Sequence, residues 1–437
     1  MRRLYTLLLT LALPLATVVV GWRGLRNREY WRGWRERFGR GAALPGQARG
    51  LWVHAVSVGE VQAATSLVRA MQARWPGAPL AVTSATPAGR TRAGASLGGS
   101  AHVRYAPYDL PWCVRAAMRR LRPGVLVIME AEIWPGLLRE CALAGIPVLF
   151  ASARLSARSA ARWQRFGALL QPALGSCVTV AAQSAADARR FESLGLAADR
   201  VHVCGNIKFD RIVGSEVVAA GSALRRRYAP ARPLWVAGST HPGEETAVLQ
   251  AHAALRRTQA DALLVLAPRH QPRFDDVGAI LDRSGLSWQR HSAARAAHPS
   301  TGPGSGVAAP AVLLLDTIGE LESFYAAADA AFVGGSLVPV GGHNLLEPAA
   351  LAVPTLAGPH QNSAPDVARL LVEGGGLRIV SDGAALAAGL SELMRDATER
   401  RRIGRAAQAT VDANRGALGR TLDLVAALVR APVAPAS

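Results

Sequence analysis

Short apolar runs alternate with longer amphipathic segments from residue 50 onward. The run LWVHAVS at 51–57 is typical of a buried strand, and the spacing of apolar residues over 60–75 predicts an amphipathic helix. Further strand-like runs follow, each before a helical pattern: LAVTSA, HVRYAP, GVLVIM, PVLFAS, CVTVAAQ and VHVC. Because strands alternate with helices, we expect βαβ units and a parallel sheet.

A second series of the same kind begins at PLWVAGS, after a polar, arginine-rich connection at 211–232. It continues through ALLVLAP, AVLLLD, AAFVGGS and VPTLAG. The pattern predicts two Rossmann-like α/β domains, over 41–213 and 214–437, with an interdomain cleft outside the carboxyl ends of the strands.

The N-terminal segment has a different pattern. Residues 4–22 contain no charge, and this length is just enough to cross a bilayer. Seven arginines follow within 23–40, with tyrosine and tryptophan between them, as is typical of a cytoplasmic membrane boundary. A cleavable signal peptide is the alternative, and it fits less well because no A-x-A site precedes the arginines. We expect 1–40 to be an uncleaved anchor, either spanning the membrane or lying in its interface near Pro14, with the remaining chain in the cytoplasm.

Composition adds a strong positive charge to this picture. The formal net charge is +19, and Lys208 is the only lysine among 50 lysine and arginine residues. The excess suits an anionic partner, such as an acidic membrane surface, a phosphorylated substrate or nucleic acid, although a general bias toward arginine is an equally good explanation. Outside the N-terminal segment no basic stretch is interleaved with aromatic residues, which argues against nucleic acid.

Polar motifs follow most of the predicted strands of the first domain. Ser57-x-x-Glu60 matches a capping box, which is the simpler interpretation; the alternative is a carboxylate presented at a helix start to take a proton from a hydroxyl. Glu130 and Glu132 come directly after GVLVIM, where two acids are costly to bury without partners; the alternative is that both are solvated acids at the start of a helix. Arg154 and Arg158 stand at another helix start and could contact a phosphate.

The second domain carries turn motifs that suit a nucleotide. They are GSTHPGEE, APRHQPRF, DTIGEL and, most distinctively, GGSLVPVGGHNLLEPAA at 334–350. Backbone N–H groups of its two diglycines could hold a phosphate, and Glu347 could accept hydrogen bonds from a ribose diol. The sequence has no GxxxxGK[ST] motif, no D-x-D on a loop and no histidine pair at metal-ligand spacing, so we expect no metal site.

With these motifs in order, the chain resembles the Kdo (3-deoxy-D-manno-octulosonic acid) transferases of lipid A–core assembly. HAVSVGE, EAEIWPG, ARLSARS, GNIKFD, GSTHPGEE, PRH, GELE and GGHNLLEP carry the resemblance, which runs from the anchor almost to the C-terminus. It implies a GT-B glycosyltransferase of two Rossmann-like domains, with the acceptor in the first and the donor in the second. It also implies an inverting, metal-independent transfer of Kdo from CMP-Kdo to lipid IVA at the inner membrane, beside anionic lipids, without nucleic acid or a bound cofactor.

The resemblance also implies roles for individual residues. Glu60 matches the family's catalytic base, and Glu130 and Lys208 match the residues that stabilise the transition state. The donor-binding segments map onto Pro268, Arg269, Ile318, Gly319, Glu320, Asn344, Leu345, Leu346 and Glu347. Two alternatives stay open on the residues alone: another nucleotide-sugar enzyme, such as a UDP-sugar transferase or epimerase, and a non-enzymatic basic protein bound to membrane or nucleic acid.

Overall fold

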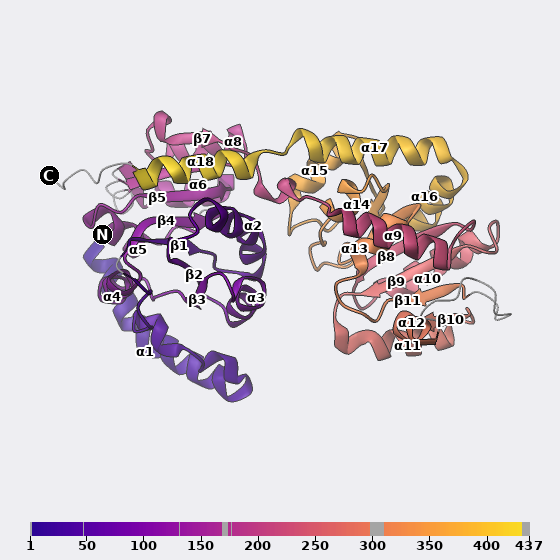
Figure 1. Cartoon of the computed structure of the whole chain (residues 1–437), viewed down its shortest axis with the longest axis horizontal. Helices are drawn as coiled ribbons and strands as arrows, with labels where there is room; N and C mark the ends of the chain where they lie inside the picture. The colour runs from indigo at the N-terminus through magenta and orange to yellow at the C-terminus, as the bar shows by residue number, and fades with distance from the viewer. Residues whose placement is uncertain are drawn as a thin grey trace. The chain divides into compact units, whose positions relative to one another are not determined.

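The computed structural model describes residues 2–46, 48–130, 132–167, 174–175, 177–297 and 310–430. The chain divides into two compact units, one made of Met1–Asp210 with Asn414–Ser437 and the other of Arg211–Ala413. Each unit contains a parallel sheet of seven strands with helices on both faces (Figure 1). This confirms the predicted α/β class and the repetition of the strand–helix pattern.

The first sheet has the strand order β3-β2-β1-β4-β5-β6-β7. Its strands are β1 (Gly50–His54), β2 (Leu80–Ser84), β3 (His102–Tyr105), β4 (Pro123–Met129), β5 (Val148–Ala153), β6 (Val178–Ala182) and β7 (Val201–Val203). The helices of this unit are α1 (Arg2–Arg26), α2 (Val58–Arg74), α3 (Pro87–Leu97), α4 (Pro111–Leu121), α5 (Pro135–Leu143), α6 (Ala157–Gln164), α8 (Ala185–Ser193) and α18 (Ala417–Arg430), with short 3₁₀ turns η1 (Arg28–Tyr30), η2 (Trp34–Phe38), η3 (Ala198–Arg200) and η4 (Ile207–Asp210).

Strand β4 explains why these runs are apolar throughout. Its alternate residues enter opposite cores: Leu126 and Ile128 pack on one face of the sheet, and Val125 and Val127 pack on the other. A central parallel strand is covered by helices on both faces, so no position along it is left to water. The same reasoning accounts for the other continuous apolar runs that sequence analysis assigned to strands.

The last helix, α18, belongs to the first unit, although sequence analysis placed 214–437 in one domain. Ala417 and Val425 are fully buried in the core on one face of the first sheet. Asp210, at the end of η4, accepts hydrogen bonds from Gly416 N (2.5 Å) and Leu418 N (2.7 Å) and so caps this helix. The unit boundary after Asp210 also lies three residues before the expected one.

The second sheet has the strand order β10-β11-β9-β8-β12-β13-β14. Its strands are β8 (Leu234–Thr240), β9 (Leu263–Pro268), β10 (Trp288–Arg290), β11 (Val312–Leu314), β12 (Ala330–Val333), β13 (Thr355–Ala357) and β14 (Leu377–Ile379). Its helices are α9 (Ser215–Tyr228), α10 (Glu244–Arg256), α11 (Phe274–Arg283), α12 (His291–Ala297), α13 (Leu321–Ala327), α14 (Leu346–Ala350), α15 (Pro365–Glu373), α16 (Gly383–Arg395) and α17 (Ala397–Ala413), with the 3₁₀ turn η5 (Gln271–Arg273).

Sequence analysis missed the two edge strands of this sheet, β10 and β14. Each has three residues, and polar side chains occupy Gln289, Arg290 and Arg378. Edge strands pair on one side only and tolerate polar residues, so neither one produces an apolar run. In both sheets the polar motifs follow the carboxyl ends of the parallel strands. They therefore lie along one side of each sheet, which we call its carboxyl edge and which is distinct from the edge strands.

Candidate active site

Glu60 lies in the first turn of α2, at the carboxyl edge of the first sheet. Its Oε1 accepts a hydrogen bond from Ser57 Oγ (2.7 Å) and its Oε2 accepts one from Val56 N (2.8 Å), while Ser57 is the N-cap of the helix. The cap that sequence analysis considered is therefore present. Burial, with 6% of the residue exposed, raises the pKa of Glu60 to about 6.

Several groups compete to set the pKa of Glu60. Burial raises it most, the hydrogen bonds from Ser57 and Val56 lower it, and the charges of Glu132 and Glu130 raise it again. The carboxylate stays ionised at neutral pH and is a stronger base than an ordinary glutamate. Capping and proton abstraction are therefore compatible here, because the cap holds the carboxylate in place while burial makes it basic.

Glu130 and Lys208 form an ion pair at the same edge. Lys208 Nζ donates to Glu130 Oε1 at 2.7 Å, and the two side chains are about one quarter exposed, at 29% and 24%. Glu130 has a φ of +55°, a left-handed conformation that disfavours a residue with a Cβ. Such strain is concentrated at functional sites, where the surrounding structure over-determines the backbone. The pair places a cation beside Glu130, one of the two carboxylates whose charge raises the pKa of Glu60.

A polar network behind Lys208 joins the ends of three strands. Asn206 Oδ1 accepts from Lys208 N (3.0 Å), and Asn206 Nδ2 donates to Gln183 Oε1 (3.2 Å). Gln183 Nε2 in turn donates to the carbonyl oxygen of Ser152 (2.8 Å), a buried residue with a φ of +51°. Sequence analysis did not single out Gln183 or Asn206 as site residues. Their signal was their place directly after predicted strands.

In the second unit, Glu244 connects the loop after β12 to the turn after β8 by hydrogen bonds. This fully buried carboxylate accepts four backbone hydrogen bonds, from His241 N (2.9 Å), Gly335 N (2.7 Å), Ser336 N (2.9 Å) and Leu337 N (2.9 Å). Sequence analysis interpreted this glycine-rich loop as a phosphate cradle. The N–H groups of 335–337 instead bind a carboxylate of the protein itself.

The second diglycine is also engaged within the loop. Gly341 N and Gly342 N both donate to Gly335 O, at 3.1 and 2.7 Å, and all three glycines have positive φ. The interpretation of their N–H groups as phosphate ligands is therefore wrong. The loop is closed by these internal hydrogen bonds, and in the segment that follows it His343 Nε2 lies 2.8 Å from His241 Nε2.

Asn344 and Glu347 are in direct contact. Asn344 Nδ2 donates to Glu347 Oε1 (3.0 Å), and Arg211 Nη1 lies 3.7 Å from the same oxygen. Burial raises the pKa of Glu347, and the charge of Arg211 opposes that rise. Between these two residues, Leu345 and Leu346 are buried in the unit, so they support the turn with their side chains.

The other expected donor-binding residues follow β9 and β11. Pro268 ends β9, and Arg269 N donates to Thr240 O at 3.0 Å. Ile318 is 76% exposed and Gly319 has a φ of +92°. Glu320 contacts Arg295 (3.3 Å) and His291 (3.5 Å) beside a cavity of about 420 Å³. These partners differ from those of Glu347, which are Asn344 and Arg211.

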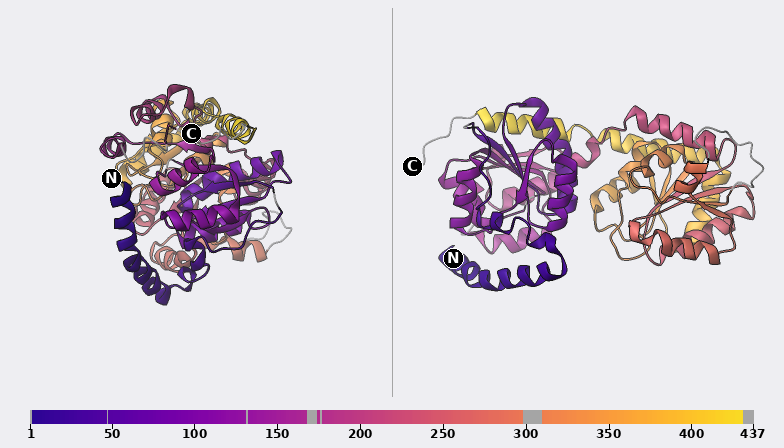
Figure 2. Two further views of the ribbon diagram at one scale, coloured as in Figure 1. Left: turned by 90° about the vertical axis from the view of Figure 1, so that its left-hand side faces the viewer. Right: turned by 60° about the horizontal axis from the view of Figure 1, so that its bottom comes forward.

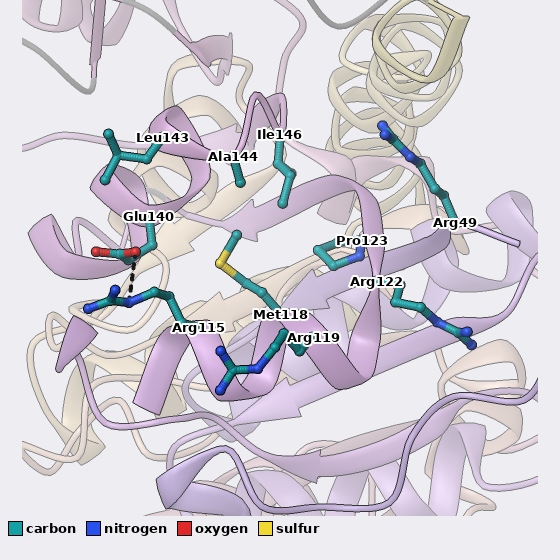
Figure 3. Close-up of a pocket in the computed structure, with 10 residues that line it drawn as sticks. All are labelled: Arg49, Arg115, Met118, Arg119, Arg122, Pro123, Glu140, Leu143, Ala144 and Ile146. Carbon is teal, nitrogen blue, oxygen red and sulfur yellow. Dashed lines mark ion pairs between the residues drawn. The ribbon is translucent and has the colours of Figure 1, made fainter. Parts of the chain in front are cut away.

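A cavity of about 570 Å³ lies at the opposite edge of the first sheet (Figure 3). Pro123 and Ile146 lie near the amino ends of β4 and β5, and Met118 forms part of the apolar lining. Arginine side chains surround it, and one of them, Arg115, is paired with Glu140 at 3.3 Å. Since β4 spans about 20 Å at 3.3 Å per residue, this cavity is separate from Glu60 and Glu130.

Comparison with known proteins assigns the family. Residues 32–211 match the family described as 3-deoxy-D-manno-octulosonic-acid transferase (kdotransferase). A 3-deoxy-D-manno-octulosonic acid transferase of Haemophilus influenzae is 37% identical over 426 residues, covering 97% of this chain and 98% of that protein. One from Bordetella pertussis is 36% identical over 435 residues, with the same coverage. The chain belongs to the 3-deoxy-D-manno-octulosonic acid transferase family.

Solved structures agree with the GT-B fold expected of a Kdo transferase. A glycosyltransferase from Rickettsia africae has a TM-score of 0.55 and covers 88% of this chain and 100% of its own, at 11% identity. MurG from Acinetobacter baumannii has a TM-score of 0.54 and covers 87% of this chain and 100% of its own, at 12% identity. These likenesses show the fold alone.

The expected catalytic residues of this family member share one edge of one sheet. Glu60, Glu130 and Lys208 follow the ends of β1, β4 and β7. The charge of Glu130 raises the pKa of Glu60, and Lys208 forms an ion pair with Glu130. In the residues that the structure describes, no group of three or more histidine, cysteine, aspartate or glutamate side chains is arranged to hold a metal ion.

Proposed function

We propose that this protein transfers Kdo from CMP-Kdo to the lipid A precursor lipid IVA during lipopolysaccharide assembly, with inversion at the anomeric carbon and without a metal ion. The observation that carries this proposal is the buried, basic Glu60 beside the Glu130–Lys208 pair, in a chain of this family. The first unit would bind the acceptor and the second unit the donor.

Glu60 would act as the general base. Its carboxylate takes the proton from an acceptor hydroxyl, the hydroxyl oxygen forms a bond to the anomeric carbon of Kdo, and the bond from that carbon to the CMP phosphate oxygen breaks. CMP leaves with the bonding electrons as an anion. One base is enough for an inverting transfer, and a base with a pKa of about 6 is ionised at neutral pH.

Lys208 and Glu130 would stabilise the charges of this step. The Lys208 ammonium is partly exposed and is oriented by Glu130, so it can approach the Kdo carboxylate or the departing phosphate. A lysine can move its point charge on a flexible stem, whereas an arginine would present a rigid fork of donors. That difference gives a reason for one lysine in a chain so rich in arginine.

Asn344, Glu347, Pro268, Arg269 and the Ile318–Glu320 segment would bind the CMP part of the donor. Glu347 Oε1 contacts both Asn344 and Arg211. A hydroxyl of the ribose diol could replace one of these two contacts and donate a hydrogen bond to this oxygen. One helix of the described chain, Arg3–Arg26, is long and apolar enough to cross a membrane. We place the enzyme at the cytoplasmic side of the inner membrane, where its acceptor is a lipid.

The test uses purified full-length protein in detergent with CMP-Kdo and lipid IVA. We expect release of CMP and a product lipid heavier by Kdo, and loss of both with Glu60→Ala. Retention of near-wild-type CMP release by Glu60→Ala would refute the assignment of the base. Calorimetric binding of UDP in preference to CMP would instead favour another nucleotide-sugar enzyme.

A further inference from the structure

Helix α1 has two different faces along its whole length. Leu9, Leu13 and Val20 are half-buried, whereas Leu11 and Leu15 are 67% and 68% exposed. The half-buried leucines are four residues apart and therefore lie on one side of the helix. Figure 2 (right) shows α1 running along the first unit rather than away from it. One face of this apolar helix is therefore partly covered by the protein to which it is attached.

One hydrogen bond connects the first turns of α1 to the body of the first unit, and another connects its last turns to the segment that follows the helix. Near the first end, Tyr5 Oη donates to Asp109 Oδ2 at 2.7 Å. Asp109 also accepts from Gly136 N (2.8 Å) and Leu137 N (2.6 Å), so the contact reaches the start of α5. Near the other end, Trp31 Nε1 donates to Gly21 O at 3.2 Å. The Tyr5 contact therefore holds the first turns of α1 against the unit, whereas the Trp31 contact orients the last turns relative to the connection that follows.

The opposite face is a continuous apolar stripe of nine large exposed side chains. They are Leu4, Leu7, Leu8, Leu11, Leu15, Val18, Val19, Trp22 and Leu25. At 3.6 residues per turn all of them fall within an arc of about 120°. Threonines lie beside this stripe, and the hydroxyls of Thr10 and Thr17 donate to Thr6 O (2.8 Å) and Pro14 O (2.7 Å).

We propose that α1 does not span the membrane but lies in the plane of one leaflet, with this stripe immersed among the acyl chains and its other face on the catalytic unit. Arginines stand at both ends of the apolar segment, Arg2 and Arg3 before it and Arg23 and Arg26 after it. Arginine favours the cytoplasmic side, and an in-plane helix keeps both ends there. The partner of this stripe is therefore one membrane leaflet, whose acyl chains surround the stripe and whose anionic head groups contact the arginines.

A spanning helix would be incompatible with the contacts of Tyr5. With Arg23 held at the cytoplasmic surface, the 18 residues back to Tyr5 would extend about 27 Å across the hydrocarbon. Tyr5 would then be on the far side, and Asp109 would lose its hydroxyl donor. The in-plane arrangement keeps that hydrogen bond and buries the stripe at the same time. It requires no particular sugar donor or acceptor, so it is independent of the proposed function.

The first test is a matched pair of charge substitutions in the full-length protein, Thr10→Lys and Leu11→Lys. Adjacent residues would lie at nearly the same depth in a spanning helix, so both lysines would then weaken membrane binding alike. An in-plane helix places Leu11 in the stripe and Thr10 at its margin, where a lysine can reach the head groups. We expect Leu11→Lys to reduce flotation with phosphatidylcholine–phosphatidylglycerol vesicles roughly tenfold or more, and Thr10→Lys to reduce it less than about twofold. Equal losses would overturn the proposal.

The second test locates the two ends of α1 without relying on lipid affinity. Arg3→Cys and Arg23→Cys are made in a Cys177→Ser background, because Cys113, Cys141 and Cys204 are buried. A membrane-impermeant maleimide is applied to inverted inner-membrane vesicles, which expose the cytoplasmic face. We expect both cysteines to be labelled there. Labelling of the cysteine at position 3 only in intact spheroplasts, from the periplasmic side, would show a spanning helix and overturn the proposal.

Discussion

Glu60 offers a direct test of the structure, because the burial that makes its carboxylate a stronger base also makes folding less favourable at neutral pH. Burial raises its pKa from 4.5 to about 6, so the folded protein favours the neutral form more than the unfolded chain does. Stability is then greatest below pH 4.5 and declines as the pH rises through about 6. Since one pKa unit is worth about 1.4 kcal/mol, the ionised carboxylate destabilises the first unit by about 2 kcal/mol at neutral pH.

The substitution Glu60→Gln removes this charge and preserves the shape of the side chain. The amide oxygen can still accept from Val56 N, and the amide nitrogen can donate to Ser57 Oγ, so the cap of α2 is retained. We expect Glu60→Gln to abolish transfer yet to raise the midpoint of thermal unfolding by about 4–8 °C at pH 7.5. At pH 4.5 the wild-type carboxylate is largely neutral, and the difference in midpoint should nearly vanish.

The assay is thermal unfolding of the full-length protein in detergent at both pH values, together with CMP release. Glu192→Gln, at an exposed position on α8, is the control and should change neither property. The same pKa predicts that the kcat/KM of the wild type falls as the pH drops below about 6. A midpoint that is lowered by Glu60→Gln at pH 7.5, or a gain of equal size at pH 4.5, would refute the electrostatic reasoning.

Two further predictions concern the other charged residues. Lys208→Arg should lose most of the CMP release while unfolding at the wild-type temperature. The planar guanidinium presents its donors in a rigid fork and cannot place a compact charge where the ammonium lies beside Glu130. Full activity of Lys208→Arg would show that the amine is not required. Glu244→Ala should destabilise the second unit by about 3–5 kcal/mol, because it leaves four buried N–H groups unpaired. Glu373→Ala removes an exposed ion pair and should change stability by less than about 1 kcal/mol. Denaturant unfolding measures both changes. Equal effects of these two substitutions would contradict the function assigned to Glu244.

Much of the site was predictable because its signals are local. Ser57 and Glu60 are one helical turn apart, and Glu130 directly follows an apolar strand, so adjacent residues place both acids at the carboxyl edge of a parallel sheet. The ion pair of Glu130 with Lys208 was not predictable. It joins residues 78 positions apart, and its geometry depends on the left-handed backbone at Glu130.

The sequence by itself therefore determined the α/β class, most of the strands and the motifs that end them, because apolar periodicity and turn chemistry act over a few residues. Only the tertiary structure decided that Glu244 occupies the N–H groups of a loop 91–93 positions away, and that α18 completes the first unit through Asp210, 206 positions before Gly416. It also showed which face of α1 is covered. Burial and hydrogen bonding of this kind depend on which distant segments meet, and no local pattern of residues encodes that.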